Sequence, residues 1–174
     1  MVKLLQMKKI GIFYGSSTGN TEVIADKIQQ MFGEEHADVF NIDAVEKNEI
    51  EQYPYLIFGT STWGLGDMQD DWEDFLDVLK TIDLSNKKVA LFGLGDQEVY
   101  SGSFVNGMGE LYEQISKRTN IVGHWPTEDY NFVASKAVKN GKFVGLAIDF
   151  DNEQKKVDGY IEKWVKLLKK EFKG

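Results

Sequence analysis

Short apolar runs alternate along the chain with longer amphipathic stretches, and this alternation restricts the fold more than any other feature. Three of the runs, residues 9–14, 55–60 and 88–95, are rich in β-branched and aromatic residues and have few polar side chains. Continuous apolar strands are typical of parallel sheets that helices cover on both faces. We therefore expect an α/β fold with a doubly wound, five-stranded parallel sheet in the order 2-1-3-4-5.

The expected elements follow from apolar spacing and from the glycines and prolines between the runs. Residues 124–142 are polar and interrupt the fifth strand, so we interpret them as an insertion. The expected strands are 9–14, 37–42, 55–60, 88–95 and a fifth split between 121–123 and 143–148; the expected helices are 20–32, 71–79, 104–116 and 157–172, on both faces of the sheet.

The chain has 174 residues, which suits one domain with a buried core. Residues 1–7 precede the first strand and are interpreted as a leader or extra N-terminal residues, which leaves 8–174 as a single domain. There are no cysteines, so disulfides and cysteine-ligated metals are excluded. The sequence shows neither a signal peptide nor an apolar run of about 20 residues, so we expect a cytoplasmic protein.

Charge is distributed unevenly along the chain. The net charge is −8, yet residues 155–174 hold seven lysines and only three acids. The acidic excess argues against nucleic acid or an anionic membrane as a partner. Six acids and no basic residue lie between Asp67 and Asp77. Such a cluster next to a binding loop would attract basic partners.

The stretch YGSSTGNT, residues 14–21, follows the first strand and precedes the first helix. Hydroxyl side chains, glycine backbone and the free N–H groups at a helix start can together hold a phosphate. The spacing matches neither the P-loop nor the dinucleotide fingerprint, so a terminal monophosphate is the expected ligand. The expected ligand-binding residues are Ser16, Ser17, Thr18, Gly19, Asn20 and Thr21.

Two aromatic residues, Trp63 and Tyr100, follow the third and fourth strands, where a loop has no core to fill. Rings on adjacent loops can enclose a flat conjugated ligand between them. Glycines beside them allow the backbone to approach the edge of that ligand. A monophosphate on one loop and a planar heterocycle between two others match FMN. The glycines concerned are Gly64, Gly66, Gly93 and Gly95.

Four segments together resemble the long-chain subclass of the flavodoxin family. They are IGIFYGSSTGNTEVIADKI, IFGTSTWGLGDMQDDWEDFL, KKVALFGLGDQEVYSGSFVNGMGELY and HWPTEDYNFVASKAVKNGKFVGLAID. The resemblance implies that Ser16 to Thr21 hold the FMN phosphate. It also implies ring contacts from the two later loops: Thr60, Ser61, Thr62, Trp63, Gly64, Leu65 and Gly66 around the inner face, Gly93, Leu94, Gly95 and Asp96 at the pyrimidine edge, and Tyr100 on the outer face.

By the same resemblance the chain is a low-potential one-electron carrier that works through a neutral semiquinone, and it is not an enzyme. In the family, a backbone carbonyl at the position of Gly64 meets flavin N5, and glycine allows that peptide to flip at little cost. Replacing Gly64 by valine is therefore expected to narrow the gap between the two one-electron potentials. A redox titration measures this gap, and unchanged potentials would contradict the idea.

The expected partners are redox proteins with basic docking faces, namely reductase-type flavoproteins and acceptor oxidoreductases, and the protein is expected to be a monomer. No residue beside the flavin loops is typical of a catalytic base. The two histidines, His36 and His124, lie elsewhere in the sequence and are interpreted as surface or structural residues. Asp149 and Asp151 both remain candidates for a place near the ring.

Two other functions are compatible with this topology. An FMN-dependent NAD(P)H:quinone reductase would need an open ring face, which a covering Tyr100 would close. A phosphorylated receiver domain needs an acidic residue at the end of the third strand, where this chain has Gly59, Thr60 and Ser61. It also needs a lysine after the fifth strand, where Asp149 stands. The carrier function remains the best supported.

Overall fold

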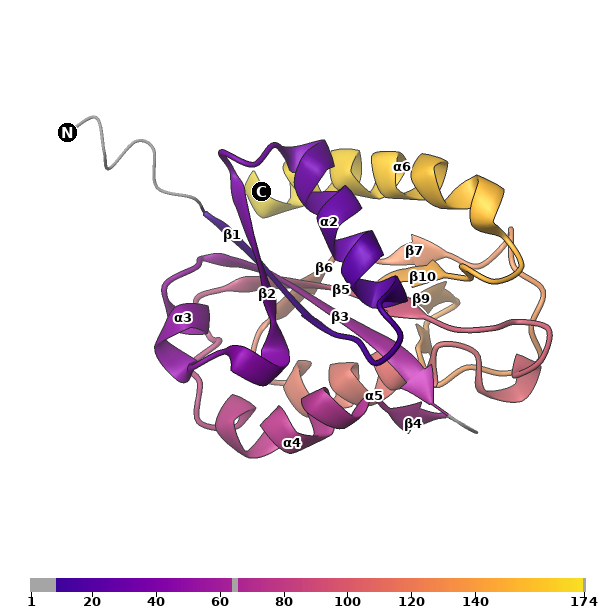
Figure 1. Ribbon diagram of the computed structural model, residues 1–174, viewed down its shortest axis with the longest axis horizontal. Coiled ribbons are helices and arrows are strands. Elements are labelled where there is room, and N and C mark those ends of the chain that lie inside the picture. Colours follow the sequence, from indigo (N-terminus) through magenta and orange to yellow (C-terminus); the bar gives the residue numbers. More distant parts are fainter. Residues whose placement is uncertain (1–8, 64–65, 174) are drawn as a thin grey trace.

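A central parallel sheet lies between two layers of helices in the computed structural model, which describes residues 9–63 and 66–173. Helices α2 (Asn20–Phe32) and α6 (Gln154–Lys173) cover one face of the sheet (Figure 1). Helices α4 (Asp70–Leu79) and α5 (Asn106–Ile115) cover the other face. The expected three-layer α/β architecture is confirmed.

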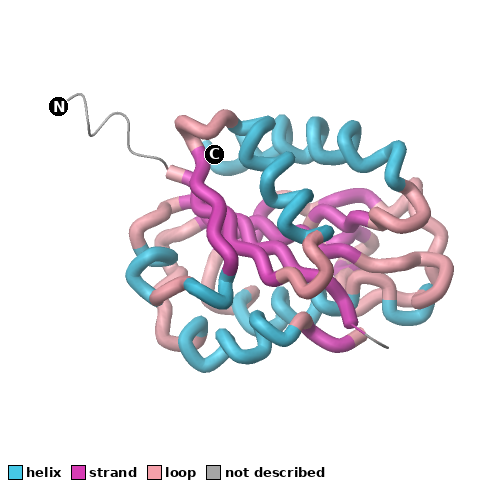
Figure 2. The backbone as a smooth tube through the Cα atoms, in the orientation of Figure 1, coloured by secondary structure: helices cyan, strands magenta, loops and turns pink. Residues whose placement is uncertain are grey.

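The four long strands of the sheet have the expected order. The sheet runs β2 (Ala37–Asn41), β1 (Ile10–Gly15), β3 (Tyr55–Trp63) and β5 (Lys88–Leu94), with all three pairings parallel. Strand β1 and the central residues of β3 and β5 are buried, because helices pack on both faces of the sheet (Figure 2), whereas most residues of β2 are only half-buried. The buried apolar runs therefore need no alternation of polar side chains.

The fifth strand is divided into two pieces that share one edge of β5. Strand β6 (Asn120–Val122) pairs with the first half of β5, and β10 (Leu146–Ile148) pairs with the second half. The insertion between them forms a small antiparallel sheet in the order β7-β9-β8. Its strands are β7 (Trp125–Pro126), β8 (Val138–Lys139) and β9 (Lys142–Phe143).

This small sheet shortens the second piece of the fifth strand. The sequence predicted a strand over residues 143–148, whereas β10 begins at Leu146. Phe143 pairs instead with Trp125 and Val138 in the small sheet. The apolar run was recognised correctly, but it is divided between two sheets.

The start of α5 also differs from the prediction. The sequence predicted a helix over residues 104–116, but α5 begins at Asn106 after a 3₁₀ turn, η2 (Ser101–Ser103). The Phe104 N–H donates to the carbonyl of Ala134 in the insertion, at 3.2 Å. Val105 takes a left-handed conformation with φ of 47°, which breaks the helical path.

Besides the three short strands of the insertion, four short elements of the described residues were not predicted, because each has too few residues for a periodic pattern. Strand β4 (Asp67–Met68) pairs antiparallel with the end of β3, which extends to Trp63. A capping box between Glu46 and Glu49 begins α3 (Lys47–Glu51). The others are η1 (Ile42–Ala44) and the η2 turn described above.

The register of the sheet brings three loops together. Gly15, at the end of β1, pairs with Thr60 of β3, and Thr60 pairs with Gly93 of β5. The residues that follow these strands therefore emerge side by side at the carboxyl edge, where ligands bind in sheets of this kind.

Candidate cofactor-binding site

The loop after β1 presents polar groups with free donors, and we call residues 15–21 the serine loop. Gly19 has a φ of 92° and precedes α2, which has no side-chain cap. The first N–H groups of α2 are therefore free of any capping side chain and can face an anion. Thr21, in the first turn, is buried and lines the cleft described below.

Two hydroxyls of the serine loop accept hydrogen bonds from the protein itself. The Gly19 N–H donates to Ser16 Oγ at 2.9 Å, and Gln69 Nε2 donates to Ser17 Oγ at 3.2 Å. A hydroxyl that accepts in this way still has its own proton to donate. Both serines can therefore donate to an outside acceptor, which explains how the loop can hold an anion without a lysine.

Gln69 lies behind the serine loop and was missed by the sequence analysis. Its side chain is buried; Oε1 accepts from the Trp72 N–H at 3.3 Å and so caps α4. A side chain at Gly15 would collide with Gln69 and Trp72. Gln69 thus joins the serine loop to the start of α4. The only sequence signal was its position directly before the acidic first turn of a helix.

The loop after β3 supplies one of two half-exposed rings. Trp63 and Tyr100 each leave 41% of their surface exposed, and both line the same cleft. Thr62 Oγ1 accepts from the Gly107 N–H at 2.9 Å, so its proton is also available. Ser61 Oγ is buried at this cleft and has no partner among the described residues. A buried hydroxyl without a partner at the wall of a cleft can form a hydrogen bond with a bound molecule.

The loop after β5 is fixed around the carboxylate of Asp96. Its Oδ1 accepts from the Glu98 N–H, the Val99 N–H and Asn152 Nδ2 at 2.8–3.0 Å. Burial alone would raise the pKa of Asp96, but these three hydrogen bonds outweigh it and hold the pKa below its usual value. Asp96 therefore stays anionic at the edge of the cleft.

The two aspartates left open by the sequence have different positions. Asp149 is 3% exposed and accepts from the Gln97 N–H at 3.1 Å and from Asn152. Asp151 lines the cleft together with Phe150, which the sequence analysis did not identify. Asp149 thus supports the loop from behind, and Asp151 is the residue that can approach a bound ring.

The insertion holds the loop that ends in Tyr100. The Asn131 N–H donates to Gln97 Oε1 at 2.7 Å, and the Val133 N–H donates to Ser101 Oγ at 2.8 Å. The Ala134 N–H adds a bond to the Ser101 carbonyl at 3.0 Å. These bonds anchor the backbone on both sides of Tyr100 to a segment far along the chain.

The predicted residues divide into those that line the cleft and those that support it. Ser16, Ser17 and Gly19 belong to the serine loop but do not line the cleft, and Thr60 is buried. Gly93 abuts Met108 of α5 instead of lining the cleft, and Gly66 lines a neighbouring acidic groove. Gly64 and Leu65 lie outside the described residues. The predicted residues that line the cleft are Thr18, Asn20, Thr21, Ser61, Thr62, Trp63, Leu94, Gly95, Asp96 and Tyr100.

Comparisons with known proteins show the family to which the chain belongs. A family model described as "Flavodoxin" matches residues 12–164. The chain belongs to the flavodoxin family. It is 49% identical to a flavodoxin of Buchnera aphidicola, over 93% of this chain and 96% of that one, and 48% identical to a flavodoxin of Synechocystis, over 94% and 97%.

A solved structure of the same family gives a close match in three dimensions. It is a Fusobacterium nucleatum flavodoxin described as bound to flavin mononucleotide, 36% identical to this chain. The match has a TM-score of 0.89 and covers 95% of this chain and 99% of that one. The family membership thus has support from both sequence and fold.

The residues of the cleft fit the cofactor of that relative. The unpartnered Ser61 Oγ offers a hydrogen bond, the two half-exposed rings offer apolar faces, and the uncapped start of α2 offers N–H donors. Within residues 9–63 and 66–173, His, Asp and Glu form no group that could hold a metal ion. No helix of that part of the chain is long and apolar enough to span a membrane.

Proposed function

We propose that this protein binds FMN non-covalently in the cleft and carries single electrons between redox proteins. The observation that carries the proposal is the pair of half-exposed rings, Trp63 and Tyr100, beside a loop whose serine protons are free to donate. Bound FMN supplies one-electron redox chemistry. The protein's own residues bind it, exclude water from its faces and set the charge around it.

Each loop has a separate task in this proposal. The serine loop and the first turn of α2 hold the phosphate, and residues Ser61 to Trp63 contact the inner side of the ring system. Leu94 to Asp96 meet its polar edge, and Tyr100 covers the outer side. An anionic Asp96 disfavours the addition of negative charge nearby, which contributes to a low reduction potential.

Uptake of FMN by the purified chain tests the proposal. Free FMN fluoresces, and stacking on Trp63 and Tyr100 should quench it, so titration with the apoprotein should give saturable quenching. Stepwise reduction of the complex should then show two separate one-electron steps. Absence of FMN binding would contradict the whole proposal. Consumption of NADH with a quinone, without an added reductase, would favour the quinone reductase instead.

We also assign the chain to the long-chain subclass of the family. The insertion between β6 and β10 forms a sheet of its own, and its residues 131–136 bond to the Tyr100 loop and to the start of α5. An insertion at this point of the fifth strand is the feature expected of that subclass.

We propose further that this protein acts as a monomer and that its partners are redox proteins with basic docking faces. An acidic groove begins directly at Trp63 and includes Asp67, Asp70, Glu73 and Glu110, with Lys136 paired to Glu110 at 2.6 Å. Four carboxylates and one paired lysine give this groove a negative charge next to the exposed ring. A basic partner is therefore guided toward the edge of the cofactor.

Neutralising Asp70 and Glu73 tests this steering. The variant Asp70→Asn/Glu73→Gln should associate about three- to tenfold more slowly with a basic c-type cytochrome at low salt, and the difference should disappear at high salt. Stopped-flow electron transfer from the reduced protein measures the rate. The control, Glu34→Gln/Glu35→Gln, removes the same charge far from the groove. An equal decrease of the association rate in both variants would mean that only the net charge of the protein matters, and it would contradict docking at the acidic groove.

A further inference from the structure

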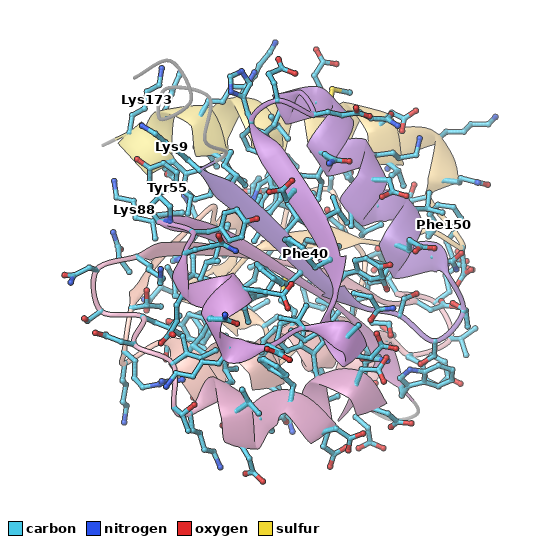
Figure 3. The ribbon with its side chains drawn as sticks, turned by 60° about the vertical axis from the view of Figure 1, so that its left-hand side comes forward. Lys9, Phe40, Tyr55, Lys88, Phe150 and Lys173 are labelled. Atoms are coloured by element: carbon cyan, nitrogen blue, oxygen red, sulfur yellow. The ribbon has the colours of Figure 1, made fainter. Side chains whose placement is uncertain are left out.

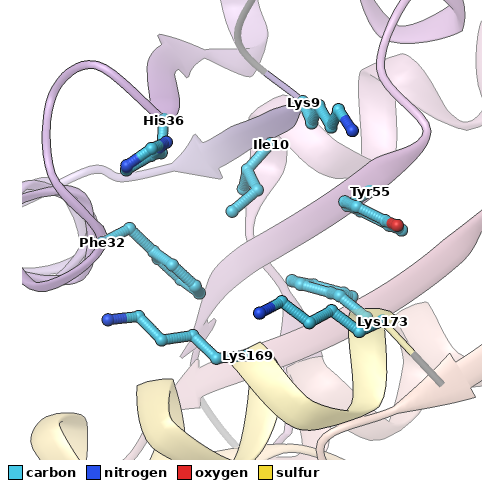
Figure 4. A pocket seen from close by; sticks show the side chains of 8 residues that line it. Lys9, Ile10, Phe32, His36, Tyr55, Lys169 and Lys173 are labelled. Carbon is cyan, nitrogen blue, oxygen red and sulfur yellow. The ribbon is translucent and has the colours of Figure 1, made fainter.

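A second pocket lies at the opposite edge of the sheet, where β1 and β3 begin (Figure 4). Its volume is about 450 Å³, within the usual range for small-molecule sites. The starts of β1 and β3, the end of α2, the residue before β2 and the last turns of α6 line it. We call it the basic pocket; its lining residues are Lys9, Ile10, Phe32, His36, Tyr55, Lys169, Phe172 and Lys173.

Stacked aromatic rings form the floor of the basic pocket. Phe172 stacks on Tyr55 with ring centroids 4.8 Å apart and an interplanar angle of 13°. Phe32 lies on the other side of Phe172, at 6.4 Å and 28°. The three rings thus form one stack, and Ile10 adds a further apolar surface. Such a floor favours a flat apolar body over a fully hydrated ion.

The rim of the basic pocket is positively charged. Lys9, Lys169 and Lys173 are exposed, and none forms an ion pair with a residue of the described chain. The nearby Lys88 is different, because its Nζ donates to the carbonyls of Glu171 and Phe172 at the end of α6. His36 lies across the pocket from Lys169 (Figure 4), and Glu35 lies 3.5 Å from its Nε2.

The basic pocket is separate from the FMN cleft. Figure 3 shows Lys9, Lys173 and Tyr55 at one end of the molecule and Phe150, which lines the cleft, at the other. The six residues of β1 lie between the two sites, or roughly 16–20 Å. A ligand in the basic pocket cannot touch the cofactor.

We propose that the basic pocket binds a small aromatic carboxylate. The carboxylate meets the ammonium groups of Lys169, Lys173 and Lys9, and the ring of the ligand packs against the edges of the stacked Phe32, Phe172 and Tyr55 rings. Unpaired lysines in a protein of net charge −8 leave a local positive site that complements a single negative charge. A neutral aromatic compound would contact the aromatic side chains but not the lysines, and a simple anion would contact the lysines alone. Either should therefore bind more weakly than an aromatic carboxylate.

The test uses the full chain loaded with FMN, so that the cofactor cleft is closed to the probe. 2-Naphthoate is titrated into ¹⁵N-labelled protein, and 2-naphthamide serves as the uncharged analogue. The backbone amides of Ile10, His36 and Tyr55 should shift with 2-naphthoate, and amides of the serine loop should not. Affinity for 2-naphthoate should exceed that for 2-naphthamide by about tenfold, and it should decrease as salt is added.

Two variants with the same charge change distinguish the effect of the pocket lysines on 2-naphthoate affinity from the effect of the protein's net charge. Lys169→Glu/Lys173→Glu should weaken 2-naphthoate binding by about tenfold or more, because attraction becomes repulsion at the rim. Lys155→Glu/Lys163→Glu makes the same charge change on α6 away from the pocket and should alter affinity less than about twofold. FMN affinity should remain unchanged in both variants.

Four results would overturn the proposal. These are equal binding of the charged and uncharged probes, equal loss in both variants, and shifts that depend on protein concentration without any probe, which would mean that a second copy fills the pocket. The fourth is binding only to a chain lacking residues 1–7, which would mean that its own N-terminal segment fills the pocket. Each of these four results can occur while FMN binds normally. Failure of this inference is therefore distinguishable from failure of the proposed function.

Discussion

Replacing both Trp63 and Tyr100 by alanine is expected to weaken FMN binding by about a hundredfold or more. Stacking of a flat heterocycle on an aromatic side chain contributes roughly 1–3 kcal/mol per ring. Loss of two rings therefore removes about 2–6 kcal/mol, and about 2.7 kcal/mol already corresponds to a hundredfold change in affinity. Because both rings are half-exposed, their removal leaves no cavity in the core.

Fluorescence quenching of FMN measures the affinity, and thermal unfolding of the apoprotein provides the control. The apoprotein of the double variant should unfold near the wild-type temperature. Tyr112→Ala is the matched control, because Tyr112 packs partly buried on the core but does not line the cleft. It should lower stability and leave FMN affinity nearly unchanged. If the double variant bound FMN as tightly as the wild type, the rings would have no part in binding.

Replacing Gln69 by alanine is the second change with a large expected effect. The variant loses the cap on α4 and the hydrogen bond to Ser17 Oγ at once. Loss of the cap costs about 1 kcal/mol, which for a domain of this size lowers the unfolding temperature by about 2–4 °C. The serine loop also loses its support, so FMN affinity should fall by about tenfold.

Gln29→Ala separates the two effects of Gln69. Gln29 Nε2 donates to the Ala37 carbonyl at 2.9 Å, so its loss also removes one side-chain hydrogen bond, far from the cleft. Both variants should be less stable, but only Gln69→Ala should bind FMN more weakly. The weaker FMN binding of Gln69→Ala should come from lost contacts to the phosphate group. Riboflavin has no phosphate, so Gln69→Ala and Gln29→Ala should bind riboflavin with similar affinity. Equal FMN affinity in the two variants would show that Gln69 serves stability alone.

Much of the fold could be predicted because its strands are buried on both faces. The run at residues 88–95 has no polar alternation, which a helix-covered parallel strand permits and an exposed strand does not. Helix α2 was predicted at its observed bounds from its apolar face and from Gly33, which ends it, and Gly33 has a positive φ in the structure. For this strand and this helix, the local sequence was sufficient to predict the structure.

Contacts between distant segments were not predictable in this way. Phe104 and Val105 have a helical apolar spacing, yet the bond from the Phe104 N–H to Ala134 holds them outside α5. Phe143 reads as part of the fifth strand, yet it pairs within the insertion. In both cases a partner about 20 to 30 residues away offers a hydrogen bond that the local pattern does not record.

In the cleft, too, some features could be predicted from the sequence and others depend on contacts between distant segments. Sequence alone determined which loops carry hydroxyls, rings and acids, because these residues follow directly after recognisable strands. Only the tertiary structure decided that Ser17 accepts from Gln69, that Asp151 and not Asp149 faces the cleft, and that Ser61 Oγ has no partner among the described residues. The physical reason is that composition and periodicity fix what a segment can bury, whereas the direction of a hydrogen bond depends on which distant group the packing places within reach.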